Sequence, residues 1–198
     1  MPTMEERMQT HDQLRQRNRK RRVALSSNQL ERAAAALAVR IESLPEFELA
    51  SRIAAYFAVN GEISLAPVID RALAAGKRVY LPGLERQSLR FSPYFHDQKM
   101  RINRFRLPEP DVAEDEMLAP GDLDLVLVPL VVFDADCNRI GMGGGYYDRS
   151  FAFRKDPAQR KPALIGVAHE MQKVERIEPE AWDVRLDKIV TDETVYRP

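Results

Sequence analysis

The chain has 198 residues, with 30 Lys and Arg against 30 Asp and Glu, and its formal net charge is zero. This length predicts a single domain (1-198) and leaves no room for two separate catalytic lobes. The neutral balance argues against a dedicated nucleic-acid binder, and 44% hydrophobic residues argue against disorder.

Cysteine content and hydropathy narrow the class further. Cys137 is the only cysteine, which excludes an intrachain disulfide and a Cys-rich zinc cage. The longest apolar run, Leu125 to Phe133, is about half the ~20 residues needed to cross a bilayer, and acidic residues stand where a signal peptide would be apolar. We therefore expect a cytoplasmic monomer with no membrane or nucleic-acid partner.

The N-terminal 25 residues predict a basic helical arm. A helical stretch from Met4 to Val23 carries most of its positive charge in its second half, at Arg15, Arg17, Arg19, Lys20, Arg21 and Arg22. Three interpretations fit: a solvated helix face, a nucleic-acid patch, or an arm that folds over a phosphate-bearing ligand. The solvated helix face is the default interpretation. The nucleic-acid patch is the least favoured of the three, because no aromatic residues are interleaved with the basic ones.

Downstream, apolar patterns alternate between strand and helix. Ser26 and Gln29 have capping-box spacing at the start of a helix that Pro45 ends. The expected elements then follow in order: strand 52–59, a turn at Asn60-Gly61, helix 65–75, strand 78–81 interrupted at Pro82-Gly83, edge strand 89–95, a mostly irregular stretch 96–118, central strand 124–133, helix 147–154, strand 163–168 and a last strand within 188–196. The pattern predicts an α/β fold: a three-layer α/β/α sandwich on an open, mostly parallel sheet.

A glycine cluster after the central strand is the first candidate site. Gly141, Gly143, Gly144 and Gly145 let backbone approach a bulky anion closely, beside a predicted helix start. Arg139 offers a forked donor for phosphate, and Asp148 offers a hard oxygen ligand for Mg²⁺. The spacing fits neither a P-loop nor a dinucleotide fingerprint, so a tightly packed structural loop is the alternative. Tyr146 and Tyr147 could equally be core aromatics.

Three other places carry candidate residues. Glu62 follows the turn at the end of the first strand, where ligands of open α/β sheets collect, although a solvated turn acid is the more ordinary interpretation. Phe57 is more typical of a core residue. Trp182 is a core plug or a stacking surface, and Asp183 caps a turn or helps to hold a cation. His169, at the end of an apolar strand, is more typical of a bonded, half-buried histidine than of a base.

These residues together resemble the 5-formyltetrahydrofolate cyclo-ligase family, also called methenyltetrahydrofolate synthetase. The resemblance is strongest in Val128 to Asp134 followed by Arg139 to Arg149. Other landmarks occur in the same order along the chain: Gly61-Glu62-Ile63, Gly76 to Pro82, Glu109-Pro110, Ile165 to His169 and Trp182-Asp183. The match spans nearly the whole chain.

The resemblance implies conversion of 5-formyltetrahydrofolate to 5,10-methenyltetrahydrofolate, driven by ATP with Mg²⁺ and releasing ADP and phosphate. Carried over by position, Arg139, Tyr146 and Glu62 would be catalytic, and Asp148 and Asp183 would bind the metal. The ATP-binding set would be Arg15, Arg139, Ile140, Gly141, Met142, Gly143, Gly144, Gly145, Tyr146 and Tyr147. The substrate-binding set would be Phe57, Glu62, Met142, Gly143, Gly144, Gly145, Tyr146 and Trp182.

Two positions depart from the family pattern. Many relatives have lysine where this chain has Gly144, and a lysine common near the arm's Leu-Arg pair is His11 here. One phosphate-neutralising charge is thus missing from the loop, and Arg139 or the arm is the expected substitute. The rival interpretations are a non-catalytic folate or nucleotide binder on the same fold, and an ATP-independent isomerase or acyl-transfer enzyme of similar architecture.

Overall fold

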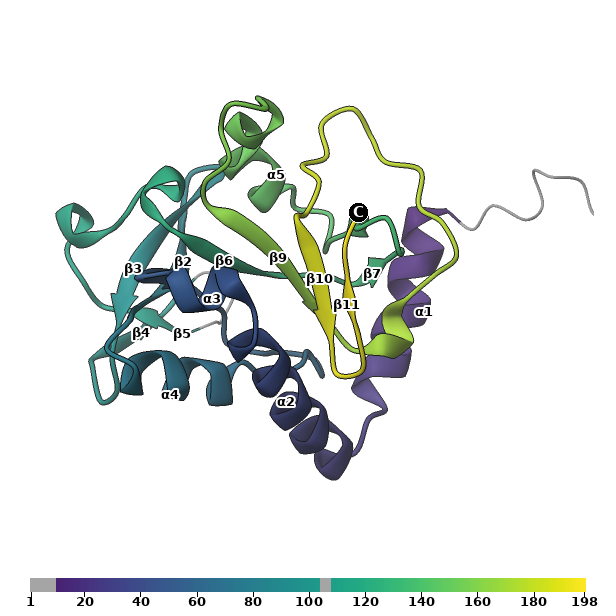
Figure 1. Cartoon of the computed structure of the whole chain (residues 1–198), viewed down its shortest axis with the longest axis horizontal. Coiled ribbons are helices and arrows are strands. Elements are labelled where there is room, and N and C mark those ends of the chain that lie inside the picture. Colours follow the sequence, from purple (N-terminus) through teal and green to yellow (C-terminus); the bar gives the residue numbers. More distant parts are fainter. Residues whose placement is uncertain (1–9, 104–107) are drawn as a thin grey trace, which may run out of the picture.

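A seven-stranded sheet organises the molecule, in the order β11-β10-β9-β6-β1-β2-β3 (Figure 1). The computed structural model describes residues 10–103 and 108–198. Strands β10, β9, β6, β1 and β2 are parallel, and β3 and β11 are antiparallel edges. The sheet strands are β1 (Arg52–Ala54), β2 (Arg78–Glu85), β3 (Ser88–Tyr94), β6 (Leu125–Pro129), β9 (Ala163–Ala168), β10 (Lys188–Thr191) and β11 (Val195–Tyr196). The predicted open, mostly parallel sheet is confirmed.

Two smaller strand pairs and a set of helices complete the described residues. The pairs are β4 (Met100–Ile102) with β5 (Pro108–Pro110), and β7 (Val132–Phe133) with β8 (Arg139–Ile140). The α-helices are α1 (His11–Val23), α2 (Ser27–Glu42), α3 (Pro45–Leu49), α4 (Ala66–Ala74) and α5 (Tyr146–Ser150). Short 3-10 helices span Glu114–Glu116, Pro120–Asp122, Ala152–Lys155 and Glu170–Gln172. No helix in the described ranges is long and apolar enough to cross a membrane.

Alternation along the central strands buries both faces of the sheet. Leu125 and Leu127 of β6 join a core with α2, α3 and α4, whereas Val126 and Val128 join a second core that includes Phe151, just after α5. Strands covered on both sides need apolar residues at every position, and this explains the unbroken apolar run in the sequence. The two cores make the three layers. Helix α1 lies beside β7 (Figure 1).

The predicted helix starts are confirmed where capping residues mark them. The Ser26 hydroxyl accepts the Gln29 backbone N–H at 3.3 Å, and the Gln29 side chain accepts the Ser26 N–H at 2.9 Å. Thr10 and Gln13 form the same reciprocal pair at the start of α1. Residues 4–9 of the predicted arm helix lie outside the described residues. Pro45 begins α3, three residues after α2 ends.

The first strand is shorter than the apolar run that predicts it. Strand β1 ends at Ala54, and the chain then turns through Asn60 and Gly61, which have φ of 52° and 73°. The Tyr56 hydroxyl donates to the Ile63 carbonyl across this turn at 3.1 Å. The Ala55 N–H still donates to the Tyr80 carbonyl of β2 at 2.9 Å, but beyond it the chain leaves the sheet, and Tyr56, Phe57 and Ala58 pack against the core instead.

The predicted strand 124–133 is two strands. Strand β6 stops at Pro129, and β7 begins at Val132 and pairs with β8 in a separate sheet. The Leu130 carbonyl accepts from the Arg22 and Gln172 side chains, at 3.3 and 3.1 Å, instead of from a strand. At this break, side chains from distant segments thus provide the hydrogen bonds that a neighbouring strand would otherwise give to the backbone carbonyl.

Other differences are local. Strand β2 continues through Pro82 to Glu85. Proline has no N–H to donate, but β1 ends opposite Tyr80, so β1 has no residue beside Pro82 that would accept such a bond. The predicted helix 147–154 is α5 followed by a 3-10 helix. The stretch 96–118 is mostly irregular, as expected, apart from β4, β5 and one 3-10 turn, and 104–107 lie outside the description.

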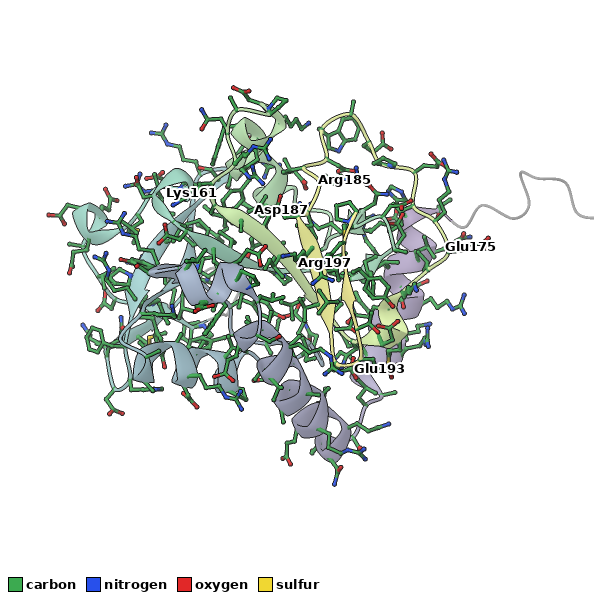
Figure 2. All side chains as sticks on the ribbon, viewed as in Figure 1. Lys161, Glu175, Arg185, Asp187, Glu193 and Arg197 are labelled. Carbon is green, nitrogen blue, oxygen red and sulfur yellow. The ribbon has the colours of Figure 1, made fainter. Side chains whose placement is uncertain are left out.

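A charged pair fixes the amino ends of β9 and β10. Arg154 donates to both carboxylate oxygens of Asp187 at 2.8 Å, and Asp187 accepts the Leu164 backbone N–H at 2.7 Å. Asp187 lies just before the start of β10 (Figure 2). This pair therefore fixes β9 relative to β10. The carboxyl ends of both strands point to the edge of the sheet where ligands of such folds collect.

Candidate active site at the carboxyl ends of β1 and β6

Strand order places the candidate site between β1 and β6. From β1 the chain continues to β2 on one side, whereas from β6 it continues to β9 on the other. Such a reversal opens a crevice outside the carboxyl ends of the two central strands. The turn that carries Glu62 follows β1. The glycine loop follows β6 after the β7–β8 hairpin folds back. The two candidate segments predicted from sequence therefore leave the sheet side by side.

Glu62 is held in a largely buried position. Its Oε2 accepts the Val59 backbone N–H at 3.1 Å, and its side chain is 10% exposed. Burial raises the pKa of this carboxyl above its ordinary value, while the hydrogen bond from Val59 and the nearby Arg22 charge oppose the rise. The solvated-turn interpretation of Glu62 is therefore wrong, because the arm and the turn enclose it.

Arg22, near the end of α1, reaches this same turn. Its side chain is 1% exposed, and it donates to the Asn60 carbonyl at 3.0 Å and to the Leu130 carbonyl at 3.3 Å. Its Nη2 lies 3.6 Å from Glu62 Oε1. One guanidinium thus joins the arm to the segments leaving β1 and β6, whereas the sequence pattern predicts Arg22 only as part of a basic cluster. The seven-residue spacing from Arg15 to Arg22 is the signal that places both on one helix face.

Two further residues complete this junction. His169 Nε2 lies 3.1 Å from the Gly61 carbonyl, and the Gln172 amide donates to the Val131 carbonyl at 2.8 Å. His169 is buried, and burial lowers its pKa, so the ring is neutral and Nε2 carries the donated proton. His169 is therefore hydrogen-bonded, as predicted, but it is buried rather than half-buried.

The glycine loop is exposed and shaped by positive backbone angles. Gly143 and Gly145 have φ of 92° and 64°, and residues 142–144 face solvent. The Arg15 side chain, from the arm, donates its Nε–H to the Gly141 carbonyl at 2.9 Å. The structure therefore brings Arg15 to the loop that the sequence analysis linked with it. Met142, at the loop's tip, is 54% exposed.

Arg139 and Asp148 form a tight pair behind the loop. Arg139 Nη2 lies 2.5 Å from Asp148 Oδ1, and the Arg139 side chain is 7% exposed. Arg139 also donates to the Val184 carbonyl, and Asp148 Oδ1 accepts the Val184 N–H at 3.1 Å. Val184 is the neighbour of Asp183, so this pairing brings the two predicted metal ligands to one locality.

Tyr147 links the two halves of the site. It packs parallel to the Phe151 ring, with centroids 6.2 Å apart. Burial first, and then the negative charge of Glu62, raise the pKa of its phenol, while the Arg139 charge opposes the rise. The charges of Glu62, in the turn after β1, and of Arg139, just before the loop, thus both act on this phenol.

The remaining predicted residues lie at different distances from this centre. Phe57 is half-buried and meets Tyr94 edge-on, with centroids 5.4 Å apart. Tyr146 is half-buried beneath the Arg149 guanidinium. The Ile140 side chain is buried with Val131, so only its backbone is placed for ligand contact. Trp182 is 65% exposed in the segment before β10, which excludes the core-plug interpretation.

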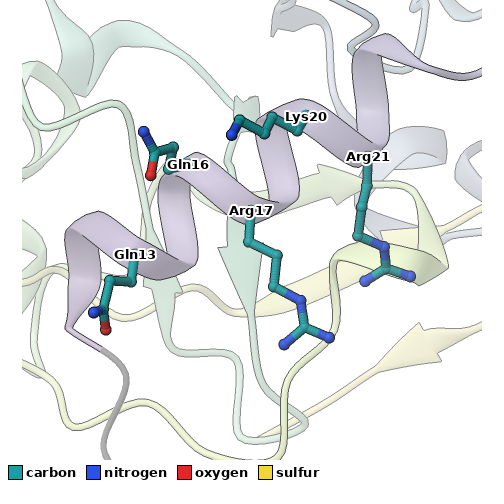
Figure 3. Close-up of a pocket in the computed structure, with 5 residues that line it drawn as sticks. All are labelled: Gln13, Gln16, Arg17, Lys20 and Arg21. Atoms are coloured by element: carbon teal, nitrogen blue, oxygen red, sulfur yellow. The ribbon is translucent and has the colours of Figure 1, made fainter.

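Two cavities adjoin these elements. One, of about 270 Å³, lies beside Arg139 and is also lined by Asn138, Pro179, Glu180, Asp183, Val184 and Arg185. The other, of about 430 Å³, is an open hollow on α1 lined by Gln13, Gln16, Arg17, Lys20 and Arg21 (Figure 3). Helical spacing puts these five on the face opposite Arg15 and Arg22. The α1 hollow is therefore separate from the glycine loop, and the Arg139 cavity is the one beside the predicted metal ligands.

Comparison with known proteins agrees with this geometry. Residues 7–192 match the 5-formyltetrahydrofolate cyclo-ligase family. The chain belongs to this family. It is 35% identical over 181 residues to the 5-formyltetrahydrofolate cyclo-ligase of Escherichia coli K12, covering 90% of this chain and 98% of that one. The Haemophilus influenzae enzyme of the same name is 36% identical over 186 residues, covering 92% and 97%.

A solved structure extends the likeness to the fold. The 5,10-methenyltetrahydrofolate synthetase of Aquifex aeolicus superposes with a TM-score of 0.80 at 30% identity, covering 94% of this chain and 92% of that one. A synthetase from Mycoplasma pneumoniae has a TM-score of 0.73 at 24% identity, over 93% of this chain and all of that one, and shows the fold alone. The chain is therefore an enzyme of the cyclo-ligase family on that family's α/β fold.

Proposed function

We propose that this cyclo-ligase converts 5-formyltetrahydrofolate to 5,10-methenyltetrahydrofolate, with ATP as co-substrate and Mg²⁺ as its metal. One observation carries the proposal: the glycine loop and buried Glu62 emerge together at the β1–β6 crevice, joined there by Arg15 and Arg22 from the arm. The loop fits an anionic phosphate chain, and the buried carboxylate fits a ring with N–H donors.

The chemistry explains the need for ATP. An N-formyl oxygen is a poor leaving group, so the γ-phosphoryl is transferred to that oxygen and the bond between the β- and γ-phosphates breaks, releasing ADP. The neighbouring N10–H then attacks the formyl carbon and gives its proton to solvent, and the C–O bond breaks as phosphate leaves and the five-membered ring closes. Phosphoryl transfer depends on positioning and charge neutralisation rather than on a protein nucleophile. The surroundings of the loop, with guanidinium groups and open backbone, match that demand.

On the nucleotide side, we assign the phosphates to the backbone of residues 140–145 with Arg15, Arg139, Tyr146 and Tyr147. Arg15 already donates to the loop at Gly141. Arg139 lies behind the loop and is paired with Asp148. Both guanidinium groups are therefore placed to neutralise charge that develops on transfer.

On the folate side, we assign Glu62 to the pterin N–H groups, with Phe57, Met142, Tyr146 and Trp182 as apolar walls together with glycines 143–145. Glu62 accepts only one described hydrogen bond, from Val59, so acceptor capacity remains on a carboxylate with two oxygens. Phe57, which follows β1, would supply aromatic surface to the ring, and the exposed Trp182 would become covered when substrate binds.

For the metal, Asp148 and Asp183 fit Mg²⁺. Within residues 10–103 and 108–198 no three His, Cys, Asp or Glu side chains converge as a metal cage. Asp148 Oδ2 and Asp183 Oδ1 make no hydrogen bond to a described residue, so each carboxylate keeps one oxygen for a cation. Mg²⁺ typically takes one or two carboxylates and fills its shell with water and substrate phosphate. Bound there, it would neutralise phosphate charge during transfer.

The test is turnover with each component left out. Purified protein with ATP, Mg²⁺ and 5-formyltetrahydrofolate should produce the methenyl chromophore over many turnovers, and parallel tubes without ATP, or with EDTA, should produce none. Product equal to the enzyme concentration would indicate a binder that does not turn over. Full activity without ATP would contradict the nucleotide role of the loop.

A further inference from the structure

Whereas Arg15 of the arm contacts the glycine loop at Gly141, Arg149, on α5, contacts it at Gly144 and Gly145. Its Nη2 donates to the Gly144 carbonyl at 2.7 Å, and its Nε donates to the Gln87 carbonyl, in the β2–β3 turn, at 2.7 Å. The guanidinium lies over the Tyr146 ring, with 5.1 Å between its carbon and the ring centroid. The side chain thus ties three segments together while remaining exposed.

The third nitrogen of this side chain is unused. Arg149 Nη1 makes no hydrogen bond to any residue in the described ranges. It lies at Gly145, where an added Cβ would be 2.6 Å from it. A side chain at Gly145 would displace the guanidinium, so the glycine there leaves room for Arg149 as well as for backbone with positive φ. The free donor is held at the surface of the loop.

Charge balance separates Arg149 from the other two cations at the loop. Arg139 forms a nearly buried ion pair with Asp148 at 2.5 Å, and Arg15 forms a pair with the exposed Asp12 at 2.5 Å. Arg149 bonds only to carbonyl oxygens, and no carboxylate among the described residues pairs with it. A phosphate that approached the loop would therefore meet one guanidinium whose full charge is available without breaking an ion pair.

We propose that Arg149 binds the nucleotide's phosphate chain, through Nη1, and supplies the positive charge that Gly144 cannot. This inference rests on the proposed function, because it assumes that the loop binds a nucleotide. The phosphate-neutralising role then falls mainly to α5, whereas the sequence predicts Arg139 or the arm for that role. The contact to Gln87 further couples the β2–β3 turn to nucleotide binding.

The experiment compares Arg149→Ala and Arg149→Lys with wild type, and uses Arg32→Ala as the matched control. Arg32 is an exposed arginine on α2, which packs on the other face of the sheet. ATP and inorganic triphosphate binding are measured by calorimetry, and Michaelis constants are measured for ATP and for folate. Arg149→Ala should weaken both triphosphate ligands about tenfold or more and leave the folate constant unchanged. Arg149→Lys should recover part of the loss, because it keeps the charge without the fork.

Three results would overturn the inference. The first is unchanged affinity for ATP and triphosphate in Arg149→Ala, and the second is an equal loss of that affinity in Arg32→Ala. The third is a Michaelis constant for folate that rises as much as that for ATP in Arg149→Ala, which would indicate a merely structural role. Thermal unfolding of each variant checks that the loop is intact. If wild type fails to turn over with ATP yet binds triphosphate through Arg149, the proposed function fails and this inference stands.

Discussion

Glu62 shows how burial tunes a single carboxyl group. Its surroundings are mostly apolar, yet it keeps a backbone donor at Val59 and a guanidinium at 3.6 Å. Desolvation disfavours the charged form, whereas both neighbours favour it, and the net result is a raised pKa. The group therefore loses its charge at a higher pH than an ordinary glutamate does.

Glu62→Gln tests this environment. Folate recognition needs the carboxylate, which is present above the raised pKa and is lost as the pH falls through it. As the pH is lowered, wild-type kcat/KM for folate should therefore begin to fall at a higher pH than it would with an ordinary glutamate. Glu62→Gln should lower that constant by about tenfold to a hundredfold at neutral pH and abolish the acid decline, because a charged hydrogen bond is worth about 1.5–3 kcal/mol. Glu31→Gln, an exposed acid on α2, is the control. A wild-type profile in Glu62→Gln would exclude Glu62 from folate binding.

Arg139 illustrates how pairing changes a residue's role. The sequence predicts a free fork for phosphate, and the structure shows a nearly buried guanidinium bonded to Asp148 and Val184. Because Arg139 is bonded to both residues, it holds the predicted metal ligands Asp148 and Asp183 in place as well as attracting an anion. Arg149, in the same loop region, has no such carboxylate partner among the described residues; it ends the family signature, but the sequence pattern gives it no role of its own.

At the scale of elements, the turn between β1 and α4 depends on a close backbone approach. A Cβ at Gly61 would be 2.5 Å from the Arg22 carbonyl oxygen of α1. Because that neighbour is backbone, relief requires α1 or the turn to move. Gly61 therefore sets how closely the arm packs against the site.

The pair Gly61→Ala and Gly76→Ala isolates this effect. Both glycines have similar positive φ, 73° and 72°, but a Cβ at Gly76 meets nothing within 4 Å. Each change should cost about 1–2 kcal/mol for the left-handed backbone, and Gly61→Ala should cost about 1–3 kcal/mol more for the clash. Urea denaturation measures the free energies of unfolding. Equal losses in the two variants would show that α1 does not pack as closely as described.

At the scale of the whole molecule, one buried cation holds the arm to the sheet. Arg22 lies 108 residues from Leu130 in sequence, and its Nη2 is buried without a hydrogen bond. Burial lowers its pKa, and the Glu62 charge opposes that shift. A buried ion costs desolvation unless it is paired, so the arm and Glu62 stabilise each other's charged forms.

Arg22→Met should release the arm. It removes two hydrogen bonds and leaves Glu62 without its cation, and losing one partner of a buried pair costs about 3–5 kcal/mol. We expect that loss in free energy of unfolding and faster amide exchange along α1. Arg22→Lys keeps the charge and should lose less, which preserves the test if the methionine variant fails to fold. Arg19→Met, exposed on the same helix, is the control. Slow α1 exchange in Arg22→Met would show that other contacts hold the arm.

Local patterns predicted much of this molecule. Capping pairs such as Ser26 with Gln29 and unbroken apolar runs such as 125–129 and 163–168 express interactions within one element, so the sequence alone predicts the alternating elements, the mostly parallel sheet and the glycine loop. The landmarks Glu62 and 139–149 also point to the family, because their residue types and order are readable along the chain.

Long-range bonding was decided only by tertiary structure. The break after Pro129 exists because Arg22 and Gln172, from either end of the chain, take the Leu130 carbonyl. The same holds for Arg149 at Gly144 and for Arg139 beside Val184. A one-dimensional pattern records which residues share a helix face or strand face, but not which distant carbonyl or carboxylate a guanidinium meets, because that depends on how the packed layers bring the segments together.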